Sequence, residues 1–170
     1  MQTSAPVPNA TVFTTAPLRH RLRVELNAPV PEVWAIVGRH DRMPEYSAGI
    51  ASVRIEQAPD GTRARVCQFR SPDGTGAGPE GREQIRWEAA NIGYATTAEA
   101  GNPFGLSNDL SLVTLEPAAT GTLFTWDQHY DAADPTAVRG SFDDAFADMA
   151  TRLIARFGGR VVERYMDGTR

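Results

Sequence analysis

The sequence predicts an α+β fold in which a curved antiparallel sheet of about seven strands surrounds one long C-terminal helix. One strand pattern precedes two short helical segments, six further strand patterns follow through short turns, and a long amphipathic segment ends the series. Strands joined by short turns pair antiparallel, and a sheet needs cover on its apolar face. Only the last segment is long enough to supply that cover.

The first elements are a strand and two short helices. Residues 21–26 alternate apolar and charged side chains, which is typical of a strand with one buried face. Pro31 favours the start of a short helix that ends at Gly38. A second short helix or turn is expected over residues 43–48, and it leads into the sheet.

Six strand patterns make up the centre of the chain. They cover residues 50–57, 63–70, 82–88, 94–99, 109–115 and 122–131. Turn-forming residues separate them, and the longest connection, residues 71–79, is loop by composition. Residues 76–81 match G-x-G-x-x-G, but a dinucleotide site requires a helix after this motif, and here a strand follows.

The last element is a long helix. Asp134 and Pro135 provide an N-cap and a favourable first helical residue. An apolar stripe at helical spacing runs from Phe142 to Leu153, and Gly158 favours the helix end. We therefore expect a flexible tail over residues 1–18, one domain over 19–159, and a tail or helix extension over 160–170.

Composition excludes several classes of protein. The net charge is −4 and no basic stripe is present, so nucleic acid is not expected as a partner. No run approaches the roughly 20 apolar residues of a membrane helix, and residues 1–18 lack the features of a signal peptide. Cys67 is the single cysteine, which favours a reducing compartment. We expect a cytoplasmic protein without metal or cofactor, and the oligomeric state is not indicated.

The fold predicts a pocket for a small hydrophobic or aromatic molecule. A strongly curved sheet that holds a single helix leaves part of its concave side unfilled. In the last strand, alternation places Phe124, Trp126 and Gln128 on one face. That face holds the aromatic residues and is therefore the concave one.

One carboxylate is expected on the same concave side. In the strand over residues 82–88, parity places Glu83 with Ile85 and Trp87. Burial without a cation would raise the pKa of such a carboxyl group. Arg65 is the candidate partner, although a structural ion pair or a strand-end residue that reaches solvent is the alternative interpretation of Glu83.

For two strands the alternation does not decide which set of residues faces the pocket. In the strand over 63–70, either Arg65, Cys67 and Phe69 or Ala64, Val66 and Gln68 face the pocket, and the first set is preferred. In the strand over 109–115, the inner set is either Asp109, Ser111 and Val113 or Leu110, Leu112 and Thr114, again with a preference for the first.

The order of motifs resembles a known superfamily. Residues 27–34 (NAPVPEVW), 83–88 (EQIRWE) and 121–126 (GTLFTW), followed by the terminal helix, are similar to the START/Bet v 1-like (SRPBCC) helix-grip superfamily. The resemblance covers about residues 20–158 and is strongest to bacterial polyketide cyclase/dehydrase-type proteins. It implies that the carboxylate at the position of Glu83 contacts ligand or ordered water.

The resemblance also implies where the pocket opens. The loop over residues 71–79 is expected at the pocket mouth, where its glycines suit either a gate or an ordinary mobile hairpin loop. His40 and Asp41 lie between the two short helices, near the same opening. They form a candidate acid/base pair.

The leading hypothesis is therefore an enzyme that cyclises or dehydrates a polyketide-like or aromatic metabolite by proton transfer. Glu83 is the expected catalytic carboxylate, assisted by Arg65 and His40. The residues expected to line the pocket are Tyr46, Cys67, Phe69, Ile85, Trp87, Tyr94, Asp109, Ser111, Phe124, Trp126, Gln128, Phe142, Phe146 and Met149. The alternatives are a non-catalytic carrier or sensor of a hydrophobic metabolite, and an interaction module whose pocket is filled by its own side chains.

Overall fold

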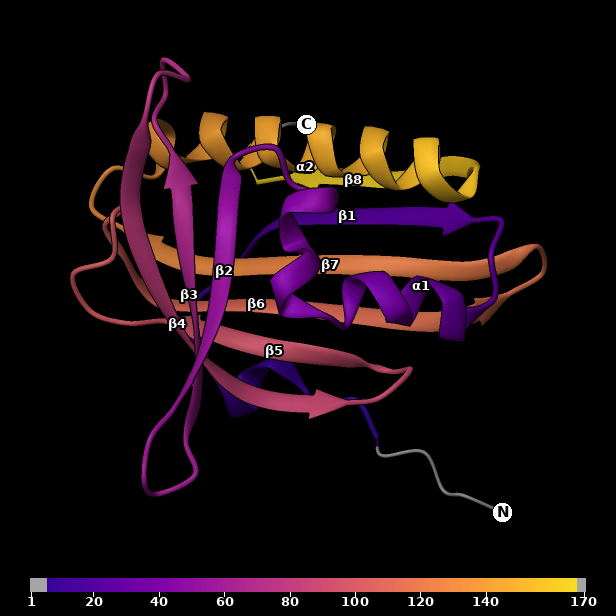
Figure 1. Ribbon diagram of the computed structural model, residues 1–170, viewed down its shortest axis with the longest axis horizontal. Coiled ribbons are helices and arrows are strands. Elements are labelled where there is room, and N and C mark those ends of the chain that lie inside the picture. Colours follow the sequence, from indigo (N-terminus) through magenta and orange to yellow (C-terminus); the bar gives the residue numbers. More distant parts are fainter. Residues whose placement is uncertain (1–5, 168–170) are drawn as a thin grey trace.

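The computed structural model describes residues 6–167, and one sheet dominates them (Figure 1). Within these residues eight strands pair in the order β2-β3-β4-β5-β6-β7-β1-β8. The strands are β1 (Leu18–Leu26), β2 (Ile50–Gln57), β3 (Arg63–Arg70), β4 (Ala77–Ala89), β5 (Gly93–Ala98), β6 (Leu106–Ala118), β7 (Gly121–Ala132) and β8 (Gly159–Met166). Every pair is antiparallel, which confirms the predicted fold class.

Strands β2 to β7 form the expected meander, since each pairs with its neighbour in the chain. β1 then pairs with β7, with Leu22 opposite Trp126 and Val24 opposite Phe124. Every second residue of β7 from Thr122 to Tyr130 is buried, so the strand presents one apolar face to the interior. The sheet curves strongly, and β2–β4 cross the direction of β6 and β7 (Figure 1).

The helix α2 (Pro135–Phe157) lies across the concave side of this sheet (Figure 1). The Asp134 side chain accepts a hydrogen bond from the Ala137 amide at 3.1 Å, which caps the helix start as predicted. The buried residues of α2 are Phe146, Met149, Ala150 and Leu153. The apolar stripe therefore faces the sheet.

Two short helices cover one end of the concave side. They are α1 (Val30–Val37) and the 3-10 helix η2 (His40–Glu45), and η2 starts three residues earlier than the segment predicted from sequence. Val33, Ile36 and Val37 of α1 are buried in one cluster with residues of β1, β7 and α2. This end of the interior is solid.

The C-terminal residues correct the prediction for 160–170. Residues 160–166 belong to β8, which pairs with β1, whereas a tail or helix extension was expected. Gly158 has φ 71° and Gly159 has φ 122°, and a Cβ on Gly159 would meet the Glu25 carbonyl oxygen at 1.9 Å. The two glycines that end α2 thus let the chain reverse against β1 and add an edge strand.

The N-terminal segment also differs from the flexible tail that was expected. Residues 1–5 lie outside the described residues, but a 3-10 turn covers Ala10–Val12. Ala10 and Phe13 pack on the convex face of the sheet against Ala95, Leu110 and Leu112. This apolar cluster on the outer face orders the segment before β1.

Candidate functional site

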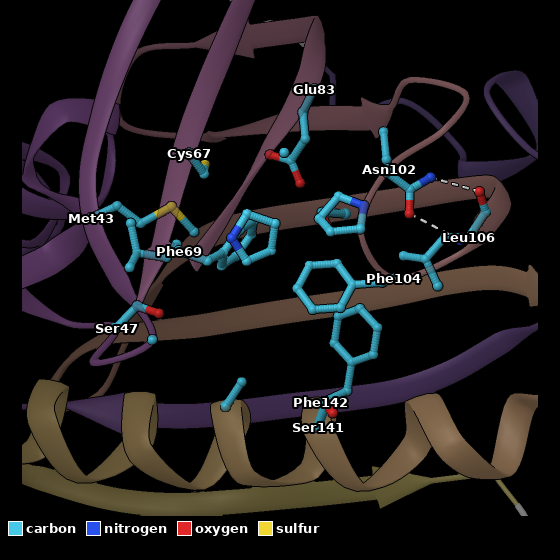
Figure 2. Close-up of a pocket in the computed structure, with 18 of the residues that line it drawn as sticks. Met43, Ser47, Cys67, Phe69, Glu83, Asn102, Phe104, Leu106, Ser141 and Phe142 are labelled. Carbon is cyan, nitrogen blue, oxygen red and sulfur yellow. Dashed lines mark hydrogen bonds between the residues drawn. The ribbon is translucent and has the colours of Figure 1, made fainter. Parts of the chain in front are cut away.

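The other end of the concave side is hollow (Figure 2). A cavity of about 550 Å³ lies between the sheet, the first half of α2 and the loop that joins β5 to β6. Protein sites for small molecules usually measure about 300–1,000 Å³ and have mainly apolar walls with a few polar groups. The position of this cavity on the concave side matches the pocket expected from the sequence.

An aromatic group borders the mouth of this cavity. The rings of Phe69 and Phe104 meet edge to face with centroids 4.9 Å apart, and Phe104 lies 6.3 Å from Phe142. These residues come from β3, the β5–β6 loop and α2, and their side chains converge in Figure 2. Phe104 is 38% exposed. The mouth therefore offers an apolar surface to an entering molecule.

Asn102 holds the loop that carries Phe104. Its Nδ2 donates to the carbonyl oxygens of Glu99, at 3.0 Å, and of Leu106, at 2.7 Å, while its Oδ1 accepts from the Leu106 amide at 3.0 Å (Figure 2). Three bonds from one side chain fix the loop ends. Sequence reasoning treated Asn102–Gly105 as a simple turn and missed its part in the cavity wall.

The floor of the cavity carries a buried ion pair. Arg65 on β3 is 1% exposed, and its Nε donates to the Glu83 carboxylate of β4. Burial lowers the pKa of Arg65, but the adjacent Glu83 outweighs that effect and holds the pKa well above its usual value. Arg65 also donates to Thr96 Oγ1 at 3.2 Å. The guanidinium is therefore a fixed cation, and Glu83 is the carboxylate that it orients.

Asp109 stands two strands away from Glu83. In the strand register Arg65 of β3 lies opposite Glu83 of β4, and Glu83 lies opposite Ala98 of β5. The Ala98 amide donates a hydrogen bond to Asp109 Oδ1 at 2.6 Å. Asp109 is 5% exposed and lines the cavity. Burial raises its pKa to about 6, and the nearby Glu83 charge adds to this effect. The small Ala98 side chain leaves space between the two carboxyl groups.

Ser111 and Gln128 continue the polar floor across β6 and β7. They are directly opposite each other, and Ser111 Oγ donates to Gln128 Oε1 at 2.5 Å. Gln128 is 1% exposed, and its Nε2 has no hydrogen-bond partner among the described residues. Trp126 Nε1, by contrast, is fully enclosed, and it also lacks a partner in this part of the chain. Two donors of the cavity floor thus have no acceptor among the described residues.

His40 corrects the expectation of a pair at the mouth. It is 3% exposed, with Nε2 3.0 Å from Glu88 Oε2 and Nδ1 3.4 Å from Arg65 Nη1. Burial, and then the Arg65 charge, lowers the His40 pKa to about 4. Asp41 instead pairs with Arg39 on the surface. His40 lies behind Arg65, because η2 inserts into the filled end of the interior.

Many predicted residues do meet at the cavity. Those that line it are Arg65, Cys67, Phe69, Glu83, Asp109, Ser111, Trp126, Gln128 and Phe142. The preferred phases of β3 and β6 are therefore the observed ones. Burial raises the pKa of the Cys67 thiol to about 12, which makes it an unreactive wall residue. The roles assigned to these residues stay predictions.

Another group of predicted lining residues lies in the solid core. It consists of Tyr46, Tyr94, Phe124, Phe146 and Met149. They are buried in one cluster with residues of α1, η2 and the second half of α2, and none of them lines the cavity. Alternation along a strand predicts the face of a residue and says nothing about what lies above it.

Trp87 is displaced by an irregularity in β4. The pairing with β5 shifts between Ile85 and Trp87. Trp87 therefore packs on the convex side, against the cluster that contains Ala95 and Leu110, and Glu88 rather than Trp87 lies on the side of His40. Ile85 precedes the shift and keeps the register of Glu83, but it does not line the cavity either. The expectation for Trp87 failed because strict alternation was assumed.

The cavity wall includes residues that sequence reasoning missed. They come from the end of η2 and the turn after it, from the β5–β6 loop and from α2. They include Met43, Ser47, Asn102, Phe104 and Ser141 (Figure 2), and also Asp148. Pro72 and Pro79, from the connection expected at the mouth, also line the cavity. The polar residues of α2 next to Phe142 were the feature of the sequence that could have indicated this part of the cavity wall.

No group of three or more His, Cys, Asp or Glu side chains in the described part of the chain is arranged to hold a metal ion. Among residues 6–167, no helix has both the length and the apolar character needed to cross a membrane.

Comparison with known proteins agrees with the fold. A search of curated protein sequences finds no match. Among solved structures, XoxI from Bacillus cereus has 18% identity and a TM-score of 0.67, covering 82% of this chain and 96% of that one. A START superfamily protein from Mycobacterium smegmatis has 16% identity and a TM-score of 0.64, covering 82% and 97%.

A third structure is a di-domain ARO/CYC protein, StfQ, from the steffimycin biosynthetic pathway. It has 13% identity and a TM-score of 0.56, and the match covers 82% of this chain and 44% of StfQ. These identities establish similarity of fold. The sequence profile described as "Polyketide cyclase / dehydrase and lipid transport" matches residues 18–165. The chain therefore belongs to the polyketide cyclase/dehydrase and lipid transport family.

Proposed function

We propose that this protein binds a small, largely apolar polyketide-like or aromatic molecule and catalyses a proton transfer that leads to cyclisation or dehydration. The Arg65–Glu83 pair on the floor of an otherwise mainly apolar cavity carries this proposal. A carboxylate in such a site can act as a general base, and the cavity walls would hold a flexible substrate in a reactive conformation.

Glu83 is suited to this role by its position. Its side chain is 21% exposed, compared with 1% for Arg65, so the carboxylate reaches the cavity while its partner is enclosed. Arg65 binds one oxygen of Glu83, and the other has no partner among the described residues. This free oxygen is the one we assign to proton abstraction from a carbon next to a carbonyl group.

The experiment uses an aryl methyl ketone as a probe of proton transfer. The protein is incubated with 2-acetonaphthone in D₂O, and exchange of the methyl protons is followed by NMR. General bases contribute about 10²–10⁴-fold to rate, so Glu83→Gln is expected to lower the protein-dependent exchange at least about 100-fold. Glu80→Gln is the matched control, because Glu80 lies on β4 but pairs with Arg54 at the surface.

Unchanged exchange in Glu83→Gln would contradict the role of this carboxylate. A second candidate function is a carrier, favoured by the mainly apolar wall and by the lipid transport included in the family description. A carrier would bind the ketone and gain thermal stability from it without any catalysed exchange.

A further inference from the structure

The proposed function leaves two groups on the cavity floor unassigned, Asp109 and Gln128. We propose that protonated Asp109 and the Gln128 amide together donate hydrogen bonds to a carbonyl oxygen of the bound molecule, two strands away from Glu83. This inference rests on the proposed apolar ligand and adds the polar group which that ligand carries. Its substrate class is a ketone with an acidic proton on the neighbouring carbon.

The hydrogen-bond pattern of Gln128 supports this assignment. Its Oε1 is occupied by Ser111 Oγ, which leaves both hydrogens of Nε2 without a partner among the described residues. Gln128 lines the cavity, and Trp126 Nε1 rather than Gln128 Nε2 is the enclosed donor without a partner among the described residues. Gln128 Nε2 is therefore open to the cavity, where an acceptor on the ligand can take its hydrogen bond.

Asp109 supplies the second donor. Its Oδ1 accepts the Ala98 amide at 2.6 Å, and Oδ2 has no partner in the described part of the chain. Ser111 lies between Asp109 and Gln128, since it is two residues along β6 from Asp109 and opposite Gln128. The free groups of Asp109 and Gln128 therefore lie on neighbouring strands, on the same face of the sheet.

Burial favours the protonated form of Asp109 below about pH 6. The other charged side chains that line the cavity are Arg65, Arg70, Arg82, Glu83, Asp144 and Asp148. Burial is the main reason that the pKa of Asp109 is raised to about 6; the Glu83 charge acts in the same direction, and the Ala98 amide and Arg65 act in the opposite direction. The pairing of Arg65 with Glu83 limits the effect of both charges on Asp109. A neutral carboxyl group is the form that can donate to a carbonyl oxygen.

The two carboxyl groups then act on one ligand without any further reactant. Glu83 takes the proton from the carbon beside the carbonyl, and the electrons of that C–H bond form a C=C bond. The carbonyl π electrons move to the oxygen, where Asp109 and Gln128 stabilise the developing negative charge. Return of the proton to carbon completes the exchange.

The test compares two ligands of nearly equal shape, 2-acetonaphthone and 2-ethylnaphthalene, which differ in a carbonyl group. Dissociation constants are measured by tryptophan fluorescence at pH 5 and pH 8. At pH 5 the ketone is expected to bind about tenfold more tightly than the hydrocarbon, because two added hydrogen bonds contribute on this scale. At pH 8 ionised Asp109 no longer donates, and the preference should fall to about threefold or less.

Variants identify the groups responsible. In Asp109→Ala the preference for the ketone over the hydrocarbon should be about threefold or less at both pH values. In Gln128→Met this preference should be lower than in the wild-type protein at both pH values, but it should still be larger at pH 5 than at pH 8. Asp127→Ala is the control, because Asp127 pairs with Arg21 on the outer face of β7. Urea unfolding checks that each variant is folded, and the pH dependence of the wild-type protein tests Asp109 without any substitution.

Each result has a distinct meaning. Equal affinity for ketone and hydrocarbon at both pH values overturns the carbonyl site but leaves the apolar pocket. A tenfold preference that persists at pH 8 and in Asp109→Ala overturns the role of Asp109. Absence of binding by either ligand overturns both this inference and the proposed function.

Discussion

The two ends of the concave side use the same sheet in opposite ways. At one end α1 and η2 pack on the concave side next to α2, and residues such as Tyr94 and Phe124 are completely enclosed. At the other end the loop carrying Phe104, the turn after η2 and the first half of α2 surround a cavity of about 550 Å³. Inward-facing aromatic residues thus stabilise the fold at one end and line a binding site at the other.

The largest expected effect is a difference in the free energy of unfolding between substitutions at the two ends. Phe124→Ala in the filled end should lower the free energy of unfolding by about 3–5 kcal/mol, because it removes a fully buried ring and leaves a cavity. Phe104→Ala at the mouth should change it by no more than about 0.5 kcal/mol. Urea unfolding followed by circular dichroism measures both. Equal losses would show that the mouth is as tightly packed as the core.

A smaller effect concerns the histidine of the filled end. Burial lowers the His40 pKa to about 4, so between pH 6.5 and pH 4 the unfolded chain binds a proton that the folded protein does not. Stability should fall over this range by about 2–3 kcal/mol for this group. His40→Gln should reduce the slope. His20, whose pKa burial also lowers to about 4, contributes in the same direction.

The carboxyl group of the hollow end should have the opposite pH dependence. The pKa of Asp109 is raised from 3.8 to about 6, so the folded protein binds the extra proton between these values. Ionisation of Asp109 therefore destabilises the fold as pH rises from about 4 to 6. Asp109→Asn, which cannot ionise, should increase the free energy of unfolding at pH 8 by about 1–2 kcal/mol. The same variant should have little effect at pH 4. Destabilisation at pH 8 would show that the charged form is well satisfied.

Much of this architecture could be predicted from local patterns. Alternation of apolar residues along β7 gave the correct buried face, and the turn residues gave the correct meander. The capping residue Asp134 and the apolar stripe after it correctly predicted α2. These features depend on contacts close in sequence, which is why one sequence is enough to read them.

Other features required the tertiary structure. The bulge in β4 changes the side on which Trp87 and Glu88 lie, and a pairing shift depends on the partner strand as well as on β4 itself. β8 forms because its backbone finds an unpaired edge of β1, a partner more than 130 residues away. A strand pattern in the sequence cannot reveal which edge remains free.

The sequence by itself determined the order of elements from β1 to α2 and the apolar faces of most strands, and it offered Arg65 as the candidate partner of Glu83. The tertiary structure decided which inward-facing residues border empty space, because that depends on where α1, η2 and α2 lie above the sheet. It also placed Asp109 and Gln128 on the same floor as Glu83. Side chains from separate strands meet only when the register of the whole sheet is known.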